Sequence, residues 1–277
     1  MEPGHEVLRR AARDLAQTRV SDKRNVLVTG GTGTLGRQVV ILLRESGHRA
    51  RILSRHPHGH VDAVEGDLAT GAGVSRAVAG MDAIVHAATE ARHSITSRGD
   101  IKGTRHLMEA AERAGIKHLV YVSIVGMEGV AYPYYRTKLA VEKLVREGRI
   151  PWTILRATQF HDLMETFLRG FSRIPGVTAI PFGWQFQPVE VKEVAQKLVD
   201  VLLGEPAAML PDFGGPEIRD FKSIGEAWLK ARGDRRRLVN LPLPLKFSGQ
   251  FASGSLLTPE HKEGKVTFDQ YLSAKYS

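Results

Sequence analysis

The sequence predicts an α/β fold: a doubly wound parallel sheet with helices on both faces. Three observations point to it. Strand-like and helix-like stretches alternate from residue 25 to about residue 156, a glycine-rich turn joins the first strand to the first helix, and 42% of the 277 residues are hydrophobic. Such alternation is typical of parallel sheets covered by helices, and a chain of this length buries a sizeable core.

The strands are expected where short runs rich in Val, Ile and Leu are bounded by turn residues. These runs cover residues 25–29, 49–54, 61–64, 83–86, 118–123 and 152–155. Between them, apolar residues recur with the period of an amphipathic helix. Helices are therefore expected at residues 35–46, 73–79, 100–114 and 133–147.

Beyond residue 156 the regular alternation ends. Helices are still expected there, separated by segments rich in Pro and Gly; they cover residues 161–170, 191–203, 221–231 and 267–275. We expect residues 25–277 to form a single domain, in which a small α/β region, 157–277, packs over the sheet part, 25–156. Residues 1–24 form a charged N-terminal appendage.

Composition narrows the kind of protein. The formal net charge is +9, but the basic residues are spread over the chain and no nucleic-acid-binding motif accompanies them, so we expect no nucleic-acid partner. The absence of cysteine excludes disulfides and thiolate metal ligands, and the histidines show no spacing of metal ligands. Without a long apolar run or a secretory signal at the N-terminus, we expect a cytoplasmic protein with no membrane contact.

The first turn carries the strongest functional signal. In "NVLVTGGTGTLGRQVVILL", residues 25–43, both Gly31-x-Gly33-x-x-Gly36 and Gly30-x-x-Gly33-x-x-Gly36 fit between a strand and a helix. Glycine permits a tight turn and lets backbone N–H groups approach a pyrophosphate, while the start of the helix favours an anion. In this context the pattern predicts a dinucleotide-binding site.

The end of the second strand refines the expected cofactor. An NAD site usually places an acidic residue there to bind the ribose hydroxyls, whereas this chain has Ser54, Arg55 and His56. A guanidinium suits the 2′-phosphate of NADP, and Arg37 lies close enough in sequence to assist. Arg55 as a plain surface residue is the alternative.

Several further segments carry a resemblance to a known family. They are "TGGTGTLG", "GDL", "VHAAT", "DIKGTRHLMEAAERAGIKHLVYVSIVG", "YYRTKLAVEKLV", "WTILRATQF", "FQPVEVKEVA" and "GGPEIRDF". Together they resemble the atypical short-chain dehydrogenase/reductases, in particular the NmrA-like branch. The resemblance implies a Rossmann-type fold, with 25–156 as the cofactor part and 157–277 covering the substrate.

The resemblance also implies which residues bind NADP(H), with NAD less favoured. They are Gly30, Thr32, Gly33, Thr34, Leu35, Gly36, Arg55, Asp67, Leu68, Ala87, Ala88, Thr89, Lys138, Ala157 and Thr158. The glycines match the phosphate loop, Arg55 and Asp67 match the adenosine contacts, and 87–89 match the loop along the middle of the cofactor. Independently of the resemblance, an ordinary turn aspartate is the alternative for Asp67.

Three residues form a candidate catalytic set. Tyr134 and Lys138 are four residues apart on a helix that Pro133 begins, so their side chains share a face. A nearby cation is expected to lower the pKa of a phenol, and Ser123 ends a strand at the edge of the sheet where ligands bind. The same three residues match the catalytic set of the family. The alternative to a catalytic role is that Tyr134 packs in the structure and Lys138 is a solvated charge.

The substrate is less well defined. Phe160, His161 and Trp184 are candidates for a partly apolar pocket, although core packing explains such residues as well. We expect an NADP(H)-dependent oxidoreductase that transfers hydride to a small carbonyl, quinone or enone-like substrate. The alternatives are a non-catalytic NADP(H) sensor acting through a protein partner, and a nucleotide-sugar epimerase or dehydratase.

Overall fold

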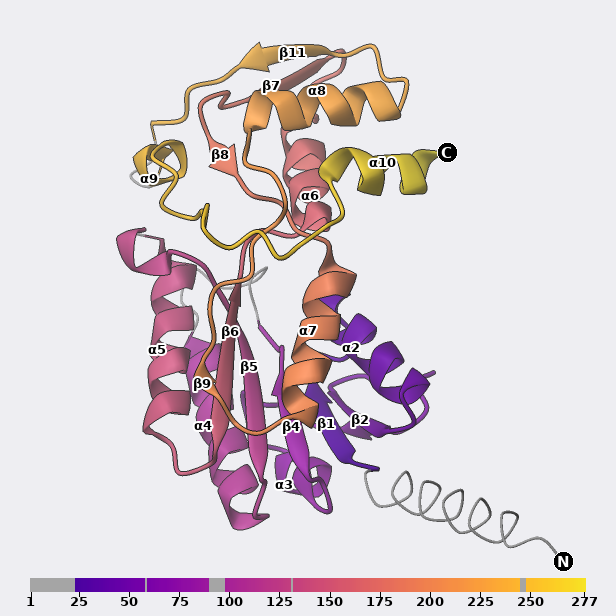
Figure 1. Ribbon diagram of the computed structural model, residues 1–277, viewed down its shortest axis with the longest axis vertical. Helices are drawn as coiled ribbons and strands as arrows, with labels where there is room; N and C mark the ends of the chain where they lie inside the picture. The colour runs from indigo at the N-terminus through magenta and orange to yellow at the C-terminus, as the bar shows by residue number, and fades with distance from the viewer. Residues whose placement is uncertain (1–22, 58, 90–97, 131, 245–247) are drawn as a thin grey trace, which may run out of the picture.

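The computed structural model describes residues 23–57, 59–89, 98–130, 132–244 and 248–277, and the predicted appendage lies almost entirely outside them. The described chain forms a sheet with helices on both faces and a second group of elements stacked at one end of it (Figure 1). No described helix is both long and apolar enough to cross a bilayer.

The sheet is parallel throughout, in the order β3-β2-β1-β4-β5-β6-β9. Its strands are β1 (Asn25–Thr29), β2 (Arg49–Ser54), β3 (Ala63–Glu65), β4 (Ala83–His86), β5 (His118–Ile124), β6 (Trp152–Ala157) and β9 (Ala208–Met209). The chain runs outward from β1 to β3 and then crosses back to β4. The strand order therefore reverses at β1, and the crevice between β1 and β4 is where such sheets bind ligands.

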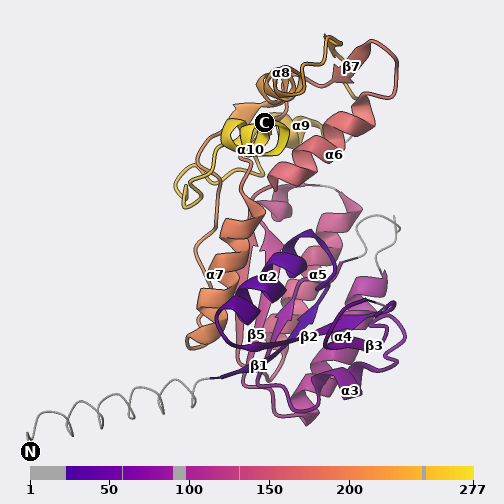
Figure 2. The same ribbon diagram turned by 90° about the vertical axis from the view of Figure 1, so that its right-hand side faces the viewer.

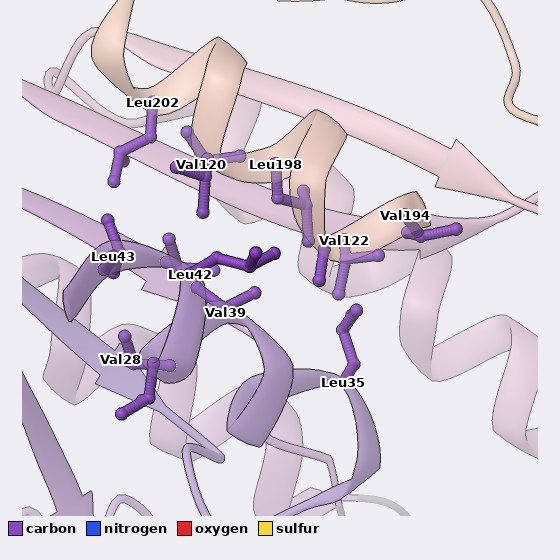
Figure 3. Close-up of a cluster of buried hydrophobic side chains, with 14 of the residues drawn as sticks. Val28, Leu35, Val39, Leu42, Leu43, Val120, Val122, Val194, Leu198 and Leu202 are labelled. Atoms are coloured by element: carbon purple, nitrogen blue, oxygen red, sulfur yellow. The ribbon is translucent and has the colours of Figure 1, made fainter. Parts of the chain in front are cut away.

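Helices cover the two faces of the sheet. α2 (Thr34–Glu45) and α7 (Val191–Leu203) lie on one face, and α3 (Val74–Val78), α4 (Arg98–Arg113) and α5 (Pro133–Glu147) lie on the other. Because side chains alternate along a strand, Val28 points toward α2 and α7 while Leu27 points toward the opposite helices. Figure 3 shows Val39 of α2 and Leu198 of α7 meeting over β1 and β5.

The elements stacked on the sheet come mostly from the C-terminal third. They are α6 (His161–Phe171), β7 (Val177–Ile180), β8 (Gln185–Phe186), β10 (Arg219–Asp220), α8 (Phe221–Ala231), β11 (Arg237–Asn240), α9 (Ser248–Ala252) and α10 (Phe268–Tyr276), and the 3₁₀ turn η1 (Met127–Gly129) packs with them. Two short sheets, β10-β8 and β11-β7, stand among these helices. We call this group the cap (Figures 1 and 2).

The predicted α/β fold is confirmed, including helices 133–147, 191–203 and 221–231 at their predicted residues. Part of the chain after residue 156 packs on the sheet rather than in the cap. α7 and β9 lie within 157–277 but return to the sheet, because the apolar face of α7, with Val194 and Leu198, is buried against it. The division of residues 25–277 into a cofactor part and a covering part remains a prediction.

Candidate functional site

The glycine turn between β1 and α2 is shaped by close backbone approaches. Gly30 has φ +71°, and a Cβ there would lie 2.8 Å from the backbone of Ala87 and Ala88. A Cβ on Gly36 would collide with the carbonyl group of Gly30, whereas one on Gly33 would meet only that carbonyl oxygen, at 3.2 Å. Gly30 and Gly36 are thus required by the fold. Gly33 is exposed, and its surroundings in the fold do not require a glycine.

The same turn starts α2, and Gly33 is the N-terminal cap residue of that helix. The amide of Gly33 donates to the Gly30 carbonyl oxygen at 2.9 Å, which closes the turn. Thr32 and Thr34 are exposed beside it, while the Leu35 side chain is buried in the core. A bare turn at a helix N-terminus fits the pyrophosphate of a dinucleotide.

Arg55 follows β2 directly and is exposed. The glycine turn packs on this strand, since a Cβ on Gly31 would lie 3.0 Å from the Ile52 side chain. Arg37, in the first turns of α2, places its guanidinium 3.4 Å from the Thr32 carbonyl oxygen. Both cations therefore come from elements that border the turn, and the strand end carries no acidic residue.

Asp67 and Leu68 lie after β3, next to α4. One carboxylate oxygen of Asp67 accepts a hydrogen bond from the Ala69 amide at 2.9 Å, so Asp67 stabilises its own turn. Leu68 is half-buried against Gly103 of α4, where an added Cβ would lie 2.9 Å from that of Leu68. The turn role that the sequence left open for Asp67 is present, and its contact with adenosine remains a prediction.

Residues 87–89 connect the glycine turn with the candidate catalytic set. The amide of Ala88 donates to the Thr29 hydroxyl at 3.3 Å. The Thr89 hydroxyl oxygen lies 3.4 Å from that of Tyr134 and 2.9 Å from a carboxylate oxygen of Asp100. Asp100 opens α4, and its place in this group was not predicted, although an acidic residue in the first turn of that helix is visible in the sequence.

Lys138 lies deep beneath Tyr134 on α5. Its ammonium donates to the Val122 carbonyl oxygen at 2.8 Å and lies 4.3 Å from the centre of the Tyr121 ring. The side chain is buried, and burial lowers the pKa of Lys138 to about 8. Ser123, at the end of β5, is also buried, with its hydroxyl 4.0 Å from the Met127 sulfur.

The pKa of Tyr134 lies above its ordinary value, which corrects the predicted lowering by Lys138. Burial raises this pKa most; the hydrogen bond with Thr89 lowers it, and the negative charge of Asp100 raises it again. The physical reason is the burial of the Tyr134 phenol. The Lys138 ammonium is also bound to the carbonyl of Val122. Tyr134 is therefore a protonated phenol at neutral pH.

Residues 157–158 join the sheet to the cap. Ala157 is buried and forms a bridge with Phe213. The Thr158 hydroxyl donates to the Gln187 carbonyl oxygen at 2.6 Å and accepts from the Gly215 amide at 3.2 Å. The side chain of Thr158 thus holds two loops together, and any contact with the nicotinamide remains a prediction.

The three candidate substrate residues lie in packed surroundings. The rings of His161 and Tyr271 stack with centroids 5.1 Å apart, and the histidine is buried. Trp184 is buried and stacks on Phe251 at 4.8 Å, and Phe160 is half-buried at the start of α6. Core packing, the alternative left open by the sequence, describes these contacts.

Comparison with known proteins agrees with this geometry. A family model of NAD(P)H-binding proteins matches residues 30–202, more than half of the chain. A 3-beta-hydroxysteroid dehydrogenase from Mycolicibacterium neoaurum is 32% identical over 200 residues, which are 56% of this chain and 55% of that protein. The chain thus spans about half the length of that relative. A ceramide reductase from Caulobacter vibrioides is 27% identical over 259 residues, 86% of this chain and 78% of the relative.

Solved structures share the fold. A short-chain dehydrogenase/reductase superfamily protein from Agrobacterium tumefaciens, crystallised with bound NAD, superimposes with a TM-score of 0.69. It is 20% identical, and the alignment covers 91% of this chain and 95% of that one. The resemblance to the atypical short-chain dehydrogenase/reductases is confirmed by these findings together. The chain belongs to the NAD(P)H-binding family, with the fold of the short-chain dehydrogenases and reductases.

Proposed function

We propose that this protein is an NADP(H)-dependent oxidoreductase that reduces a small carbonyl, quinone or enone-like substrate. The observation that carries the proposal is a continuous path from the glycine turn to a protonated phenol. Gly30 packs against Ala87 and Ala88, and the next residue, Thr89, lies beside the Tyr134 hydroxyl. A cofactor lying along this path has its phosphates at the turn and its reactive end near Tyr134.

In this proposal, bound NADP(H) supplies the hydride, and side chains of the protein hold and donate the proton. The raised pKa of Tyr134 keeps its phenol protonated, as required of a group that donates a proton to a developing alkoxide. Lys138 is assigned to the nicotinamide ribose and to the positive potential beneath Tyr134. Ser123 is assigned to the substrate oxygen.

The named relatives support redox chemistry at a carbonyl or alcohol carbon. One is a hydroxysteroid dehydrogenase and the other a ceramide reductase. Both names describe substrates with large apolar parts. For this chain we therefore favour an apolar carbonyl compound over a nucleotide sugar, whose phosphates need several basic contacts.

Replacing Tyr134 by Phe tests the proposal directly. We expect turnover to fall by about 10² to 10⁴-fold with NADPH affinity unchanged, because only the proton donor is lost. Loss of reduced-nicotinamide absorbance with quinones and aldehydes measures turnover, and calorimetry measures affinity. Tyr132→Phe is the matched control, since Tyr132 lies at the exposed start of the same helix. Full activity in Tyr134→Phe contradicts the assignment. No turnover in the wild type, together with NADPH-dependent binding of a protein partner, indicates the sensor instead.

The NADP preference has its own test. Removing Arg55 with alanine should reduce the preference for NADPH over NADH by about 5 to 150-fold, the equivalent of about 1 to 3 kcal/mol for charge-assisted hydrogen bonds to a phosphate. Calorimetric titration of both cofactors at one ionic strength measures it. Arg49→Ala, at the opposite end of the same strand, is the control. Equal affinities of the wild type for both cofactors would refute the preference.

A further inference from the structure

A buried histidine lies where the strand order of the sheet reverses. His86 is the last residue of β4 and pairs in register with Thr29, the last residue of β1. Both side chains are buried, and so is that of Thr104 on α4. The rest of β4 is apolar. A buried imidazole among apolar neighbours needs a hydrogen-bond partner at each ring nitrogen to offset the cost of its burial.

Both ring nitrogens of His86 have such a partner. Nδ1 lies 2.7 Å from the Thr29 hydroxyl oxygen, and Nε2 lies 3.0 Å from the Thr104 hydroxyl oxygen. Each hydroxyl also contacts the backbone. Thr29 accepts from the Ala88 amide at 3.3 Å, and Thr104 donates to the Asp100 carbonyl oxygen at 2.8 Å. His86 therefore links the end of β1, the loop after β4 and the first turn of α4.

The two ends of this network fix the position of every proton in it. A carbonyl oxygen only accepts, so the Thr104 proton goes to Asp100, and the Thr104 oxygen accepts from Nε2–H of His86. Burial lowers the pKa of His86 to about 3, so the ring is neutral and Nδ1 carries no proton. Nδ1 therefore accepts from the Thr29 hydroxyl, whose oxygen accepts from the Ala88 amide. A single tautomer of His86 satisfies all four hydrogen bonds.

The loop that follows His86, residues 87–89, is held from both sides of the ring. On the Nδ1 side, the network fixes the Ala88 amide. On the Nε2 side, Thr104 holds the first turn of α4, where the Asp100 carboxylate accepts from the Thr89 hydroxyl at 2.9 Å. The same loop borders the glycine turn, so it is backbone along the proposed cofactor path.

We propose that His86 is a positioning residue for the cofactor: with its proton on Nε2, it holds loop 87–89 in the conformation that receives the middle of the dinucleotide. The inference rests on the cofactor path of the proposed function. His86 is buried behind the loop, so it acts on the cofactor only through the loop backbone. A loop that is already fixed loses little conformational freedom on binding, which raises affinity.

A second histidine network gives an internal control at the opposite edge of the sheet. His118 begins β5, and Thr153 lies on the neighbouring strand β6. The Thr153 hydroxyl oxygen lies 2.8 Å from Nε2 of His118 and accepts from the Ala207 amide at 2.9 Å. Nδ1 of His118 lies 3.3 Å from the Leu202 carbonyl oxygen, which only accepts. This histidine therefore carries its proton on Nδ1, the opposite tautomer to that of His86.

The first test compares NADPH affinity in Thr29→Val, Thr29→Ser and Thr153→Val by calorimetric titration of the full chain. Thr29→Val removes the acceptor of the Ala88 amide and the donor to His86, so we expect Kd to rise about 10-fold. Thr29→Ser keeps the hydroxyl and should stay within about 2-fold of the wild type. Thr153→Val should lower Tm to a comparable extent and leave Kd unchanged, because its network lies at the other edge of the sheet.

The second test determines the tautomers and needs no cofactor. In protein labelled with nitrogen isotope at histidine, two-bond proton–nitrogen correlations distinguish a ring protonated on Nε2 from one protonated on Nδ1. We expect the Nε2–H form for His86 and the Nδ1–H form for His118, each assigned by the signals that His86→Phe or His118→Phe removes. The measurement is made on the wild type, so it decides the matter even where Thr29→Val does not fold.

The outcomes separate this inference from the proposed function. An unchanged Kd in Thr29→Val overturns the positioning role, and so does a Kd raised equally in Thr153→Val, since a general loss of stability then explains it. Thr29→Ser binding as weakly as Thr29→Val overturns it too, as does an Nδ1–H form of His86. A wild type that binds neither NADPH nor NADH overturns both proposals. A wild type that binds NADPH but reduces no carbonyl, quinone or enone overturns the proposed function alone, because the positioning role is measured by affinity.

Discussion

The sheet and the cap are held together by different means. Strands of the sheet are buried between two apolar clusters, one against α2 and α7 and one against α3, α4 and α5. The cap has an aromatic core of its own, but polar side chains buried within it fasten its loops and its last helix. The position of the sheet's strands and helices therefore follows from local hydrophobic periodicity. The arrangement of the cap's loops and last helix depends in addition on single buried polar side chains.

Gln187 and Glu165 show how the cap is fastened. The Gln187 amide donates to the carbonyl oxygens of Gly215 at 2.9 Å and Thr258 at 3.2 Å, and its oxygen accepts from the Thr258 amide at 2.8 Å. The buried Glu165 carboxylate accepts from the Trp228 indole at 3.0 Å and from the Tyr271 hydroxyl at 3.0 Å, and also binds Lys275 and Tyr276. Each side chain joins segments distant in sequence.

The largest effect is expected in the sheet, at Gly36. Gly36→Val should abolish NADPH binding and destabilise the fold by about 3 kcal/mol or more, because its Cβ would collide with the carbonyl of Gly30. Gly33→Val should also lose binding but keep most of its stability, since Gly33 is exposed and its Cβ meets only one atom, at 3.2 Å. Urea unfolding and NADPH titration measure both, and equal stabilities of the two variants would contradict the distinction.

A smaller effect is expected in the cap, at Glu165. Burial opposes its ionisation, but hydrogen bonds from Lys275, Tyr276 and Trp228 lower its pKa to about 2. With an ordinary value near 4.5, Glu165→Gln should cost on the order of 3 kcal/mol at pH 7. Because the pKa is lowered on folding, this stabilisation is present above about pH 4.5 and is lost as the pH falls toward 2.

Thermal unfolding at pH 7 measures the loss, and NADPH affinity should change little because the proposed cofactor path lies on the sheet. The control is Glu226→Gln, whose exposed carboxylate pairs with Lys222 at 3.6 Å on α8. Such a pair contributes a few tenths of a kcal/mol at most. Equal losses in both variants would show that α10 is not fastened by Glu165.

The same contrast explains what the sequence could predict. Strands 25–29, 49–54 and 83–86 were predicted at their observed residues because each is a short apolar run bounded by turn residues. The cap strands β7, β8, β10 and β11 were missed, since each has two to four residues and forms only through pairing with a distant partner. Helices such as 221–231 carry their own periodicity and were predicted.

The candidate site divides in the same way. The glycine turn is formed by residues adjacent in sequence, so its position between a strand and a helix could be predicted from the glycine spacing. Asp100 was missed because its link to Tyr134 passes through Thr89, 45 residues from the tyrosine. The predicted direction of the Tyr134 pKa was wrong because spacing on a helix does not reveal that the phenol is buried, nor that the Val122 carbonyl binds Lys138.

The smallest expected effect compares one buried histidine from each region. His86, in the sheet, bonds the hydroxyls of Thr29 at 2.7 Å and Thr104 at 3.0 Å, and burial followed by the charge of Lys138 lowers its pKa to about 3. His161, in the cap, places Nε2 3.1 Å from the Val266 carbonyl oxygen, and burial lowers its pKa to about 4. Its Nδ1 is buried with no partner among the described residues.

Both histidines are neutral in the folded protein and take up protons on unfolding below about pH 6.5. Their lowered pKa values make the protein lose stability as the pH falls from 6.5 toward 4. His161→Phe should remove the part of this loss that comes from His161. The loss of stability between pH 7.5 and 5.5 should then be smaller by about 1 kcal/mol. At pH 7.5 the cost should be about 1 kcal/mol, because one hydrogen bond is lost and the ring still packs on Tyr271. His86→Phe should cost more at every pH, since two buried hydroxyls each lose one hydrogen bond. Urea unfolding at both pH values measures each variant; an unchanged acid loss in His161→Phe would mean that this histidine is not neutral in the folded cap.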